Sequence, residues 1–323
     1  MIPNSRHMIS LGSILFLFSL LLLFPDICLS GVNTGIKLCL TALMPSIFPF
    51  VLISNIIMRL GVAQTIGRLL YPVMHLLFRT SLYGGYAVFM GFFCGYPLGA
   101  KVTNDLLEQH LISEDEANRI ICFSNNTSPG YLQNYLLITL LGPLPHKIFF
   151  ILLYYIPVIL YGILSGFAAD HDNVSSDPFR SGRNLDPSGH TDTFSVKTLD
   201  SCILESFKTM IKLCGYLIIF SILSAFIYQK LPICLSFKYF LTALCEITTG
   251  SSYLSESAYP LPVKAVCCIA ATSFGGFSTL MQTRSVCTNK NISIHNYILA
   301  RLLIAVSVIL LYMTALNLFH IPL

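Results

Sequence analysis

Long apolar runs separated by short polar stretches recur along the whole chain. A helix of about 20 apolar residues spans the roughly 30 Å hydrocarbon core of a bilayer. This pattern predicts an all-α polytopic membrane protein with about nine membrane segments. The nine runs that reach or approach this length are 8–29, 36–58, 83–100, 119–141, 147–169, 206–229, 236–255, 262–282 and 296–319.

Four of these runs contain Gly, Pro, Ser, Thr or Asn near their middle: 83–100, 119–141, 236–255 and 262–282. Backbone N–H and C=O groups that leave helical geometry cannot face lipid, so such segments must face protein or water. A re-entrant hairpin and a broken helix both fit each segment, and the sequence leaves these alternatives open.

The polar interruptions follow the same order in two halves of the chain. We therefore expect an N-terminal membrane helix at 1–30, a first repeat at 31–169 and a second repeat at 206–323. The intervening stretch, 170–205, is rich in acidic residues, Ser, Gly and Pro, which predicts an aqueous polar linker. The span count predicts parallel repeats, whereas hairpins would make them inverted. Paired interrupted segments in two halves are typical of a transporter's binding site.

Composition agrees with a membrane protein. Of the 323 residues, 54% are hydrophobic and 11% are charged, and the mean hydropathy is +0.73. These values exclude a soluble enzyme, because soluble chains average about 25% charged residues. The net charge of +4 is scattered along the chain, which argues against a nucleic-acid partner. The 11 cysteines and 8 histidines show no metal-ligand spacing, and hydrolase motifs are absent, so we expect no metal, no cofactor and no enzymatic activity.

Two candidate binding segments lie in the first half. The run Gly95-Tyr96-Pro97-Leu98-Gly99-Ala100-Lys101 ends an apolar stretch, and Tyr96, Gly99 and Lys101 are its candidate solute contacts. A packing seam of small residues is the alternative for this run. The second segment follows Arg119, and its candidate solute contacts are Arg119, Ser124, Asn125, Asn126, Thr127 and Ser128. The five consecutive polar side chains at 124–128 are costly in hydrocarbon unless they meet partners or solute. A plain loop is its alternative.

Two more candidate segments lie in the second half. Glu246 is the one acidic residue well inside a predicted span, so we expect it to bind a proton or cation during transport; a hydrogen-bonded structural glutamate is the alternative. A half-helix after the glycine pair near 275 would direct its N-terminal N–H groups at an anion. The candidate solute contacts of this half are Thr248, Thr249, Ser251, Gly275, Gly276, Ser278 and Arg284.

Several of these motifs resemble the YlbJ-type sporulation integral membrane proteins and, more loosely, the nucleoside-recognition or Gate domain. The resemblance covers about residues 30–320 and is most specific in GYPLGAK at 95–101 and SNNTSP at 124–129. The residues that match the signature are Tyr96, Pro97, Gly99, Lys101, Ser124, Asn125, Ser128 and Pro129 in the first half, and Glu246, Thr249, Gly250, Gly275 and Gly276 in the second.

The resemblance implies a protein of spore-forming bacteria in the mother-cell membrane around the forespore. It also implies a permease for dipicolinate or a similar small anion, with the lipid bilayer and other sporulation membrane proteins as partners. Amide and hydroxyl donors, two helix N-termini and the flanking cations Lys101, Arg119 and Arg284 would suit such an anion. Two alternatives remain: a nucleoside or cation carrier of the Gate type, and a non-transporting assembly factor of the spore envelope. The sequence does not indicate the oligomeric state.

Overall fold

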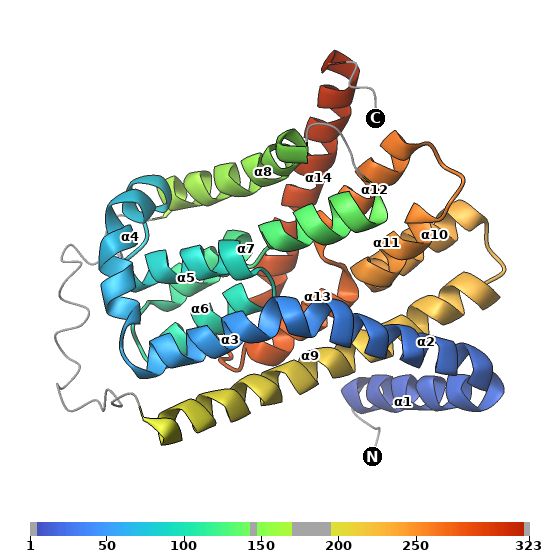
Figure 1. The fold of residues 1–323 in the computed structure, drawn as a ribbon, viewed down its shortest axis with the longest axis horizontal. Helices are drawn as coiled ribbons and strands as arrows, with labels where there is room; N and C mark the ends of the chain where they lie inside the picture. The colour runs from blue at the N-terminus through green and yellow to red at the C-terminus, as the bar shows by residue number, and fades with distance from the viewer. Residues whose placement is uncertain (1–4, 143–146, 170–194, 320–323) are drawn as a thin grey trace.

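The protein is described by a computed structural model that covers residues 5–142, 147–169 and 195–319. Within these ranges it is all-helical, without β-strands, which confirms the predicted α class (Figure 1). Its helices are α1 (Ser5–Leu23), α2 (Pro25–Leu38), the π-helical η1 (Cys39–Leu43), α3 (Met44–Arg59), α4 (Ala63–Phe78), α5 (Leu82–Cys94), α6 (Leu98–Glu108), α7 (Glu114–Ser124), the π-helical η2 (Tyr131–Leu140), α8 (Lys147–Ala168), α9 (Val196–Lys230), α10 (Leu235–Cys245), α11 (Ile247–Ser255), α12 (Leu261–Phe274), α13 (Gly276–Val286) and α14 (Ile294–Phe319).

Five helical segments of the described chain are long and apolar enough to cross a membrane. They do not reproduce the expected set of nine single crossings. The first predicted run, 8–29, ends as a helix at Leu23, and Pro25 begins a new segment that continues through η1 to Arg59. The five segments are Pro25–Arg59, Ile148–Ala168, Val196–Lys230, Leu261–Val286 and Ile294–Ala315.

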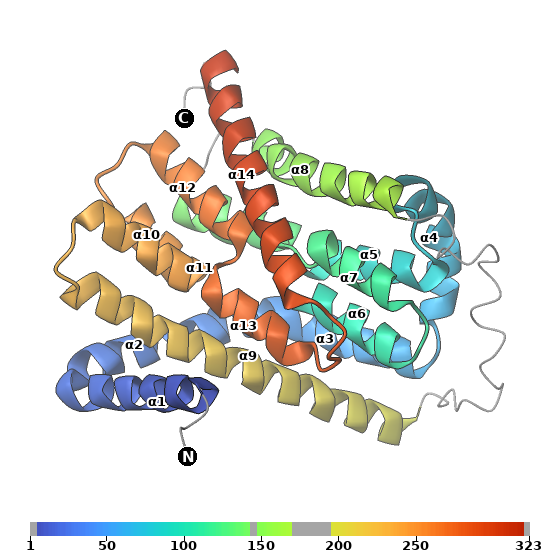
Figure 2. The ribbon, with the colours of Figure 1, turned by 180° about the vertical axis from the view of Figure 1, so that it is seen from behind.

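Two of the interrupted runs, 83–100 and 236–255, form helical hairpins instead of single crossings. The helices of each pair, α5 with α6 and α10 with α11, have 9 to 13 residues, so each is about 14 to 20 Å long and too short to span the bilayer. The partners of each pair pack against one another. The two hairpins approach the middle of the molecule from opposite sides (Figures 1 and 2).

Both hairpins depend on glycines that allow close packing. A Cβ placed on Gly99 would lie 2.9 Å from the Cα atom of Gly91 in the facing helix. A Cβ placed on Gly250 would lie only 2.3 Å from the Cα atom of Ala243. Real Cβ atoms do not approach backbone atoms this closely, so the helices of each hairpin can pack at this distance only without side chains at these two positions.

The other two interrupted runs, 119–141 and 262–282, are broken helices. In the first, α7 ends at Ser124 and the chain becomes helical again at Tyr131 as η2. In the second, Gly275 separates α12 from α13 with a φ of +96°, a left-handed conformation that L side chains rarely adopt.

The expected linker and the N-terminal half show two further differences from the sequence analysis. Residues 170–194 lie outside the described ranges, but Val196–Glu205, which were assigned to the linker, form the first turns of α9. Ser195 caps this helix by accepting a hydrogen bond from the Thr198 N–H.

The amphipathic helix α4 was not predicted as a separate element, and it packs against α5 and α8 (Figure 1).

Candidate functional site

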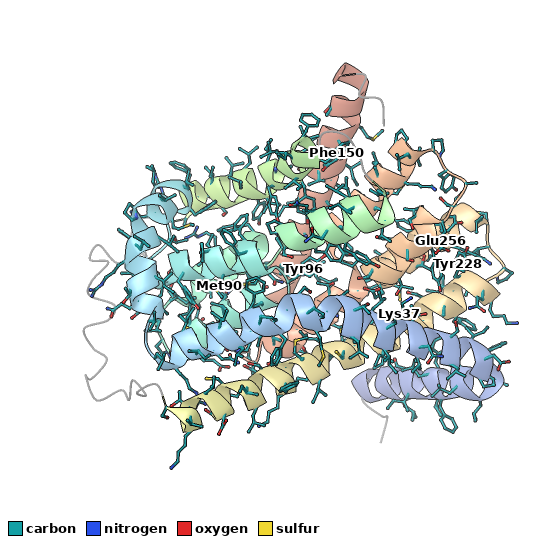
Figure 3. All side chains as sticks on the ribbon, in the orientation of Figure 1. Lys37, Met90, Tyr96, Phe150, Tyr228 and Glu256 are labelled. Atoms are coloured by element: carbon teal, nitrogen blue, oxygen red, sulfur yellow. The ribbon has the colours of Figure 1, made fainter. Side chains whose placement is uncertain are left out.

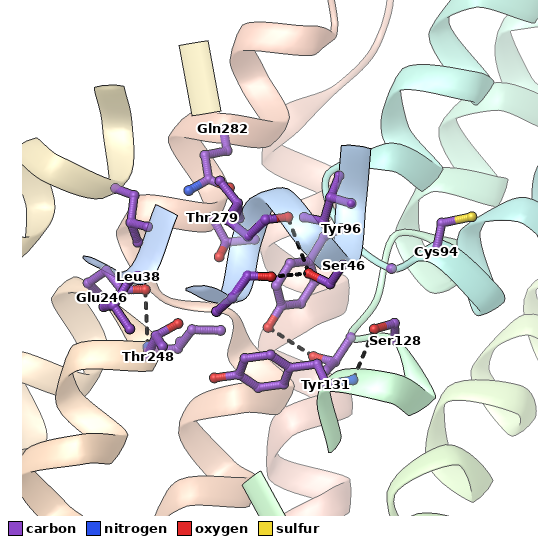
Figure 4. Close-up of a pocket in the computed structure, with 17 residues that line it drawn as sticks. Leu38, Ser46, Cys94, Tyr96, Ser128, Tyr131, Glu246, Thr248, Thr279 and Gln282 are labelled. Carbon is purple, nitrogen blue, oxygen red and sulfur yellow. Dashed lines mark hydrogen bonds between the residues drawn. The ribbon is translucent and has the colours of Figure 1, made fainter. Parts of the chain in front are cut away.

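All four interrupted runs contribute residues to one cavity between the hairpins (Figure 4). Its solvent-accessible volume is about 70 Å³. The remaining wall is formed by η1 with its flanking residues and by Leu217 of α9. The residues of the interruptions that line it are Cys94, Gly95 and Tyr96 at the α5–α6 turn, Thr127, Ser128 and Tyr131 between α7 and η2, Glu246, Ile247 and Thr248 at the α10–α11 turn, and Thr279 and Gln282 on α13.

The first hairpin tip is joined to the α7–η2 interruption by hydrogen bonds. The backbone N–H of Tyr96 donates to the carbonyl of Asn126 at 2.6 Å. The Thr127 hydroxyl donates to the Tyr96 hydroxyl at 2.9 Å, and the Tyr96 hydroxyl donates to the carbonyl of Thr272 at 3.3 Å. Tyr96 and Thr127 therefore form one continuous piece of the cavity wall.

Asn125 lies behind this wall and connects three elements. Its Oδ1 accepts a hydrogen bond from the Ala100 N–H at 3.2 Å, which caps the first turn of α6. Its Nδ2 is 3.0 Å from the Thr283 Oγ1 and 2.9 Å from the Tyr297 hydroxyl. Asn125 is fully buried and does not line the cavity, so its contacts are with protein groups.

Glu246 lines the cavity and caps the helix that begins beside it. Its side chain is 2% exposed, and its two carboxylate oxygens accept hydrogen bonds from the N–H groups of Thr248 at 3.0 Å and Thr249 at 2.6 Å. The N-terminus of a helix carries a partial positive charge, which stabilises a carboxylate at this position. No basic side chain of the described residues forms an ion pair with Glu246, so α11 supplies its electrostatic compensation.

The N-terminus of α13 has no comparable cap. Its N-cap residue is Gly275, and no side chain accepts a hydrogen bond there. One turn further on, Thr279 and Gln282 line the cavity, and the Gln282 Nε2 donates to the Ser278 hydroxyl at 3.2 Å.

The three cations expected to attract an anion do not line the cavity. Lys101 Nζ lies 2.6 Å from Asp105 Oδ2 and donates to Asn55. Arg119 donates to the carbonyls at 78 and 79. The Arg284 guanidinium donates to the carbonyl of Cys287 at 2.7 Å. Each cation is held by protein acceptors outside the cavity, so the structure does not bring these three candidate residues together around it.

The candidate residues thus separate into two groups. Tyr96, Thr127, Ser128, Thr248 and Glu246 line the cavity. The remaining candidates pack behind or away from it, and they are Gly99, Lys101, Arg119, Ser124, Asn125, Asn126, Thr249, Ser251, Gly275, Gly276, Ser278 and Arg284. Among the residues that the structure describes, no three His, Cys, Asp or Glu side chains gather as a metal site.

Sequence reasoning missed several residues of this region. Ser46, Tyr131, Thr279 and Gln282 line the cavity but were not among the candidates. Arg301 was missed as well, although it is fully buried on α14. The same search applied to bases would have included Arg301 without singling it out, because Lys208, Lys212, Lys238 and Lys264 also lie within predicted spans.

The fold and the cavity together define a class: an all-helical integral membrane protein in which two hairpins and two broken helices converge on a buried polar cavity. Within this class, the chain is similar to the sporulation integral membrane protein YlbJ of Bacillus subtilis (strain 168). The two are 26% identical over 349 aligned positions, which cover 95% of this chain and 83% of that protein. This match confirms the resemblance found in the sequence and supports a YlbJ-type assignment. No family model and no solved structure matches the chain significantly.

Proposed function

We propose that this sporulation membrane protein is a permease that moves dipicolinate, or a similar small anion, across the outer forespore membrane. The observation that carries the proposal is that all four interrupted runs contribute residues to one cavity. If each interruption were isolated from the others, its polar residues could be explained by helix packing as well as by solute binding. A shared polar cavity instead favours a site for a hydrophilic solute over a non-transporting assembly factor.

The order of elements supports an alternating-access mechanism. Apart from α4, which lies between α3 and α5 and has no counterpart in the second half, the two halves share an order of elements. A long helix, a hairpin, a broken helix and a further long helix follow one another as α3, α5–α6, α7–η2 and α8 in the first half, and as α9, α10–α11, α12–α13 and α14 in the second. The hairpins approach the cavity from opposite sides (Figures 1 and 2). This favours the inverted form of the repeat over the parallel one, and inverted repeats around a central site are typical of secondary transporters.

The cavity is smaller than an aromatic dicarboxylate requires. Its volume of about 70 Å³ holds about five to seven water molecules, at about 10–15 Å³ for each. We therefore expect the wall to move when solute binds, with the hairpin tips as the moving parts.

Glu246 supplies the coupling in this proposal. An anionic solute in the cavity would be repelled by a charged Glu246 carboxylate, since like charges within a few ångströms disfavour one another. A proton or a cation on Glu246 removes that repulsion. Anion binding and proton or cation binding therefore favour each other, as co-transport requires.

Dipicolinate flux into liposomes that contain only this protein tests the proposal. We expect saturable flux above that of protein-free liposomes, with a higher rate under an inward proton gradient. Flux no greater than that of empty liposomes, with or without a proton or sodium gradient, would contradict it. Labelled nucleosides in the same assay test the alternative of a Gate-type nucleoside carrier.

A further inference from the structure

Arg301 is a buried cation without a described anionic partner. It lies on α14, is 0% exposed and is the largest fully buried side chain of the described chain. No carboxylate of residues 5–142, 147–169 or 195–319 forms an ion pair with it. A buried charge without a counter-ion is costly, because the desolvation of the charge is not offset by a nearby opposite charge.

The hydrogen bonds of Arg301 leave donors unused. Its Nη1 donates to the Asn126 Oδ1 at 2.9 Å, and its Nη2 donates to the carbonyl of Ser273. Its Nε has no acceptor, and neither has the Asn126 Nδ2. The Asn126 Oδ1 is shared, since it also accepts from the Tyr154 hydroxyl at 2.8 Å. Two buried N–H donors beside a full positive charge therefore lack an acceptor.

The cluster formed by Arg301 and Asn126 lies next to the cavity wall. Asn126 directly precedes Thr127, which lines the cavity with Tyr96. The side-chain hydrogen bond between Thr127 and Tyr96, at 2.9 Å, holds this part of the wall together. Ser273, the other acceptor of Arg301, lies at the end of α12 beside the Gly275 break. The guanidinium thus bridges both broken helices, at the place where the wall could open.

We propose that Arg301 and Asn126 form the subsite that binds a carboxylate group of the solute, an inference that rests on the proposed anion permease. The unused donors, Arg301 Nε and Asn126 Nδ2, hydrogen-bond the carboxylate, and the carboxylate supplies the negative charge that balances the guanidinium. A guanidinium suits a planar carboxylate better than an ammonium does. The carboxylate reaches the subsite when the hydrogen bond between Tyr96 and Thr127 opens. Water in this place would satisfy the donors but not the charge.

Asn126→Asp separates this role from a structural one. The new carboxylate keeps the acceptor for Arg301 and Tyr154 and adds the missing negative charge. We expect the thermal midpoint of the purified protein to stay equal or rise, while affinity for pyridine-2,6-dicarboxylate falls about 10-fold or more, as for a lost charged hydrogen bond. A variant that is at least as stable and binds the dicarboxylate like the wild type would overturn the subsite.

Arg301→Gln and a neutral probe complete the test. The probe is pyridine-2,6-dicarboxamide, which has the ring and shape of the dicarboxylate without its charge. We expect Arg301→Gln to weaken dicarboxylate binding about 10- to 100-fold. Binding of the neutral diamide should change by no more than about twofold, which is less than about 0.5 kcal/mol. Arg68→Gln, at an exposed position on α4, is the matched control and should bind both probes like the wild type.

The outcomes distinguish the two proposals. If the wild type neither binds nor transports the dicarboxylate, the permease proposal fails and the subsite fails with it. If the wild type binds it and a folded Arg301→Gln binds it equally well, the subsite alone is overturned. If Arg301→Gln does not fold, Asn126→Asp decides, because that variant preserves the contacts of Arg301.

Discussion

The two hairpin tips that border the cavity differ in how the second helix of each is capped. In the first hairpin, the Ala100 N–H of α6 donates to Asn125, which belongs to the neighbouring broken helix. In the second, the first N–H groups of α11 donate to Glu246 of the same tip. The first cap is a neutral amide from another element, and the second is a carboxylate from the hairpin itself.

This difference assigns the hairpins different roles in the proposed transport cycle. A movement of the first tip must also move the α7–η2 interruption, since Asn125 and the Tyr96 N–H join them. The Glu246 carboxylate of the second tip is instead held by N–H groups of its own hairpin. We therefore expect the first hairpin to transmit movement and the second to respond to protons or cations.

The largest effect is expected where the helices of a hairpin touch. Gly250→Ala places a Cβ 2.3 Å from the Cα atom of Ala243, so the helices must separate, and overpacking of this kind costs about 1–3 kcal/mol or more. We expect little folded protein by size-exclusion chromatography in detergent. Gly99→Ala, whose added Cβ has its nearest atom at 2.9 Å, should reduce the amount of folded protein less. The two variants therefore compare the two hairpins directly.

Gly215→Ala is the matched control for these glycine variants. It lies within α9, and apart from the neighbouring backbone of that helix no atom lies within 4 Å of its added Cβ. Removing a glycine from a helix interior stabilises the helix by about 0.5–1 kcal/mol. A Gly250→Ala protein as stable as Gly215→Ala would show that the hairpin does not need this close approach.

The second prediction concerns the charge of the second tip. Glu246→Gln keeps an oxygen that caps α11 but cannot carry the coupling charge. A gradient of one pH unit coupled to one proton drives about tenfold accumulation, since tenfold corresponds to about 1.4 kcal/mol. We expect the variant to equilibrate dipicolinate across the liposome membrane without accumulating it. The measurement is the internal dipicolinate concentration at steady state, made once under a proton gradient and once under a sodium gradient.

Glu256→Gln is the control for the charge of this hairpin. Glu256 is exposed, directly follows α11 and lies far from the central Tyr96, toward the right-hand side of Figure 3. It should accumulate solute like the wild type. Accumulation by Glu246→Gln under the same gradient would assign the coupling to another group.

The sequence was a good guide to which segments contain a break and a poor guide to how the chain continues after each break. The runs 83–100 and 119–141 have similar apolar lengths, yet one is a hairpin and the other a broken helix. Apolar length does not reveal whether the chain turns back at a break. In the hairpin, the turn at 95–97 is followed by a helix packed against its predecessor, and that packing is a tertiary contact with no local signal.

The site shows the same division between local and distant information. Tyr96, Thr127 and Glu246 were found because each lies at the break itself, where the chain meets the cavity. Lys101 lies one turn into α6 and pairs with Asp105 instead. Arg301 is far from every break in sequence and reaches two of them only through the packing of α14. Its single charge is also obscured by the high average hydropathy of that helix.

The smallest effect is expected at the neutral cap of the first tip. Asn125→Ala removes the acceptor of the Ala100 N–H and the donor to Thr283 and Tyr297, and a buried group left without its partner costs about 1–3 kcal/mol. We expect a lower unfolding midpoint in detergent, with the exposed Asn296→Ala as the control. Hydrogen exchange should rise in both α6 and the α7–η2 segment, because Asn125 joins them, whereas Glu246→Gln should raise exchange in α11 alone. Faster exchange confined to one element in the Asn125 variant would mean that the first tip, too, is capped independently, and the proposed difference between the hairpins would not hold.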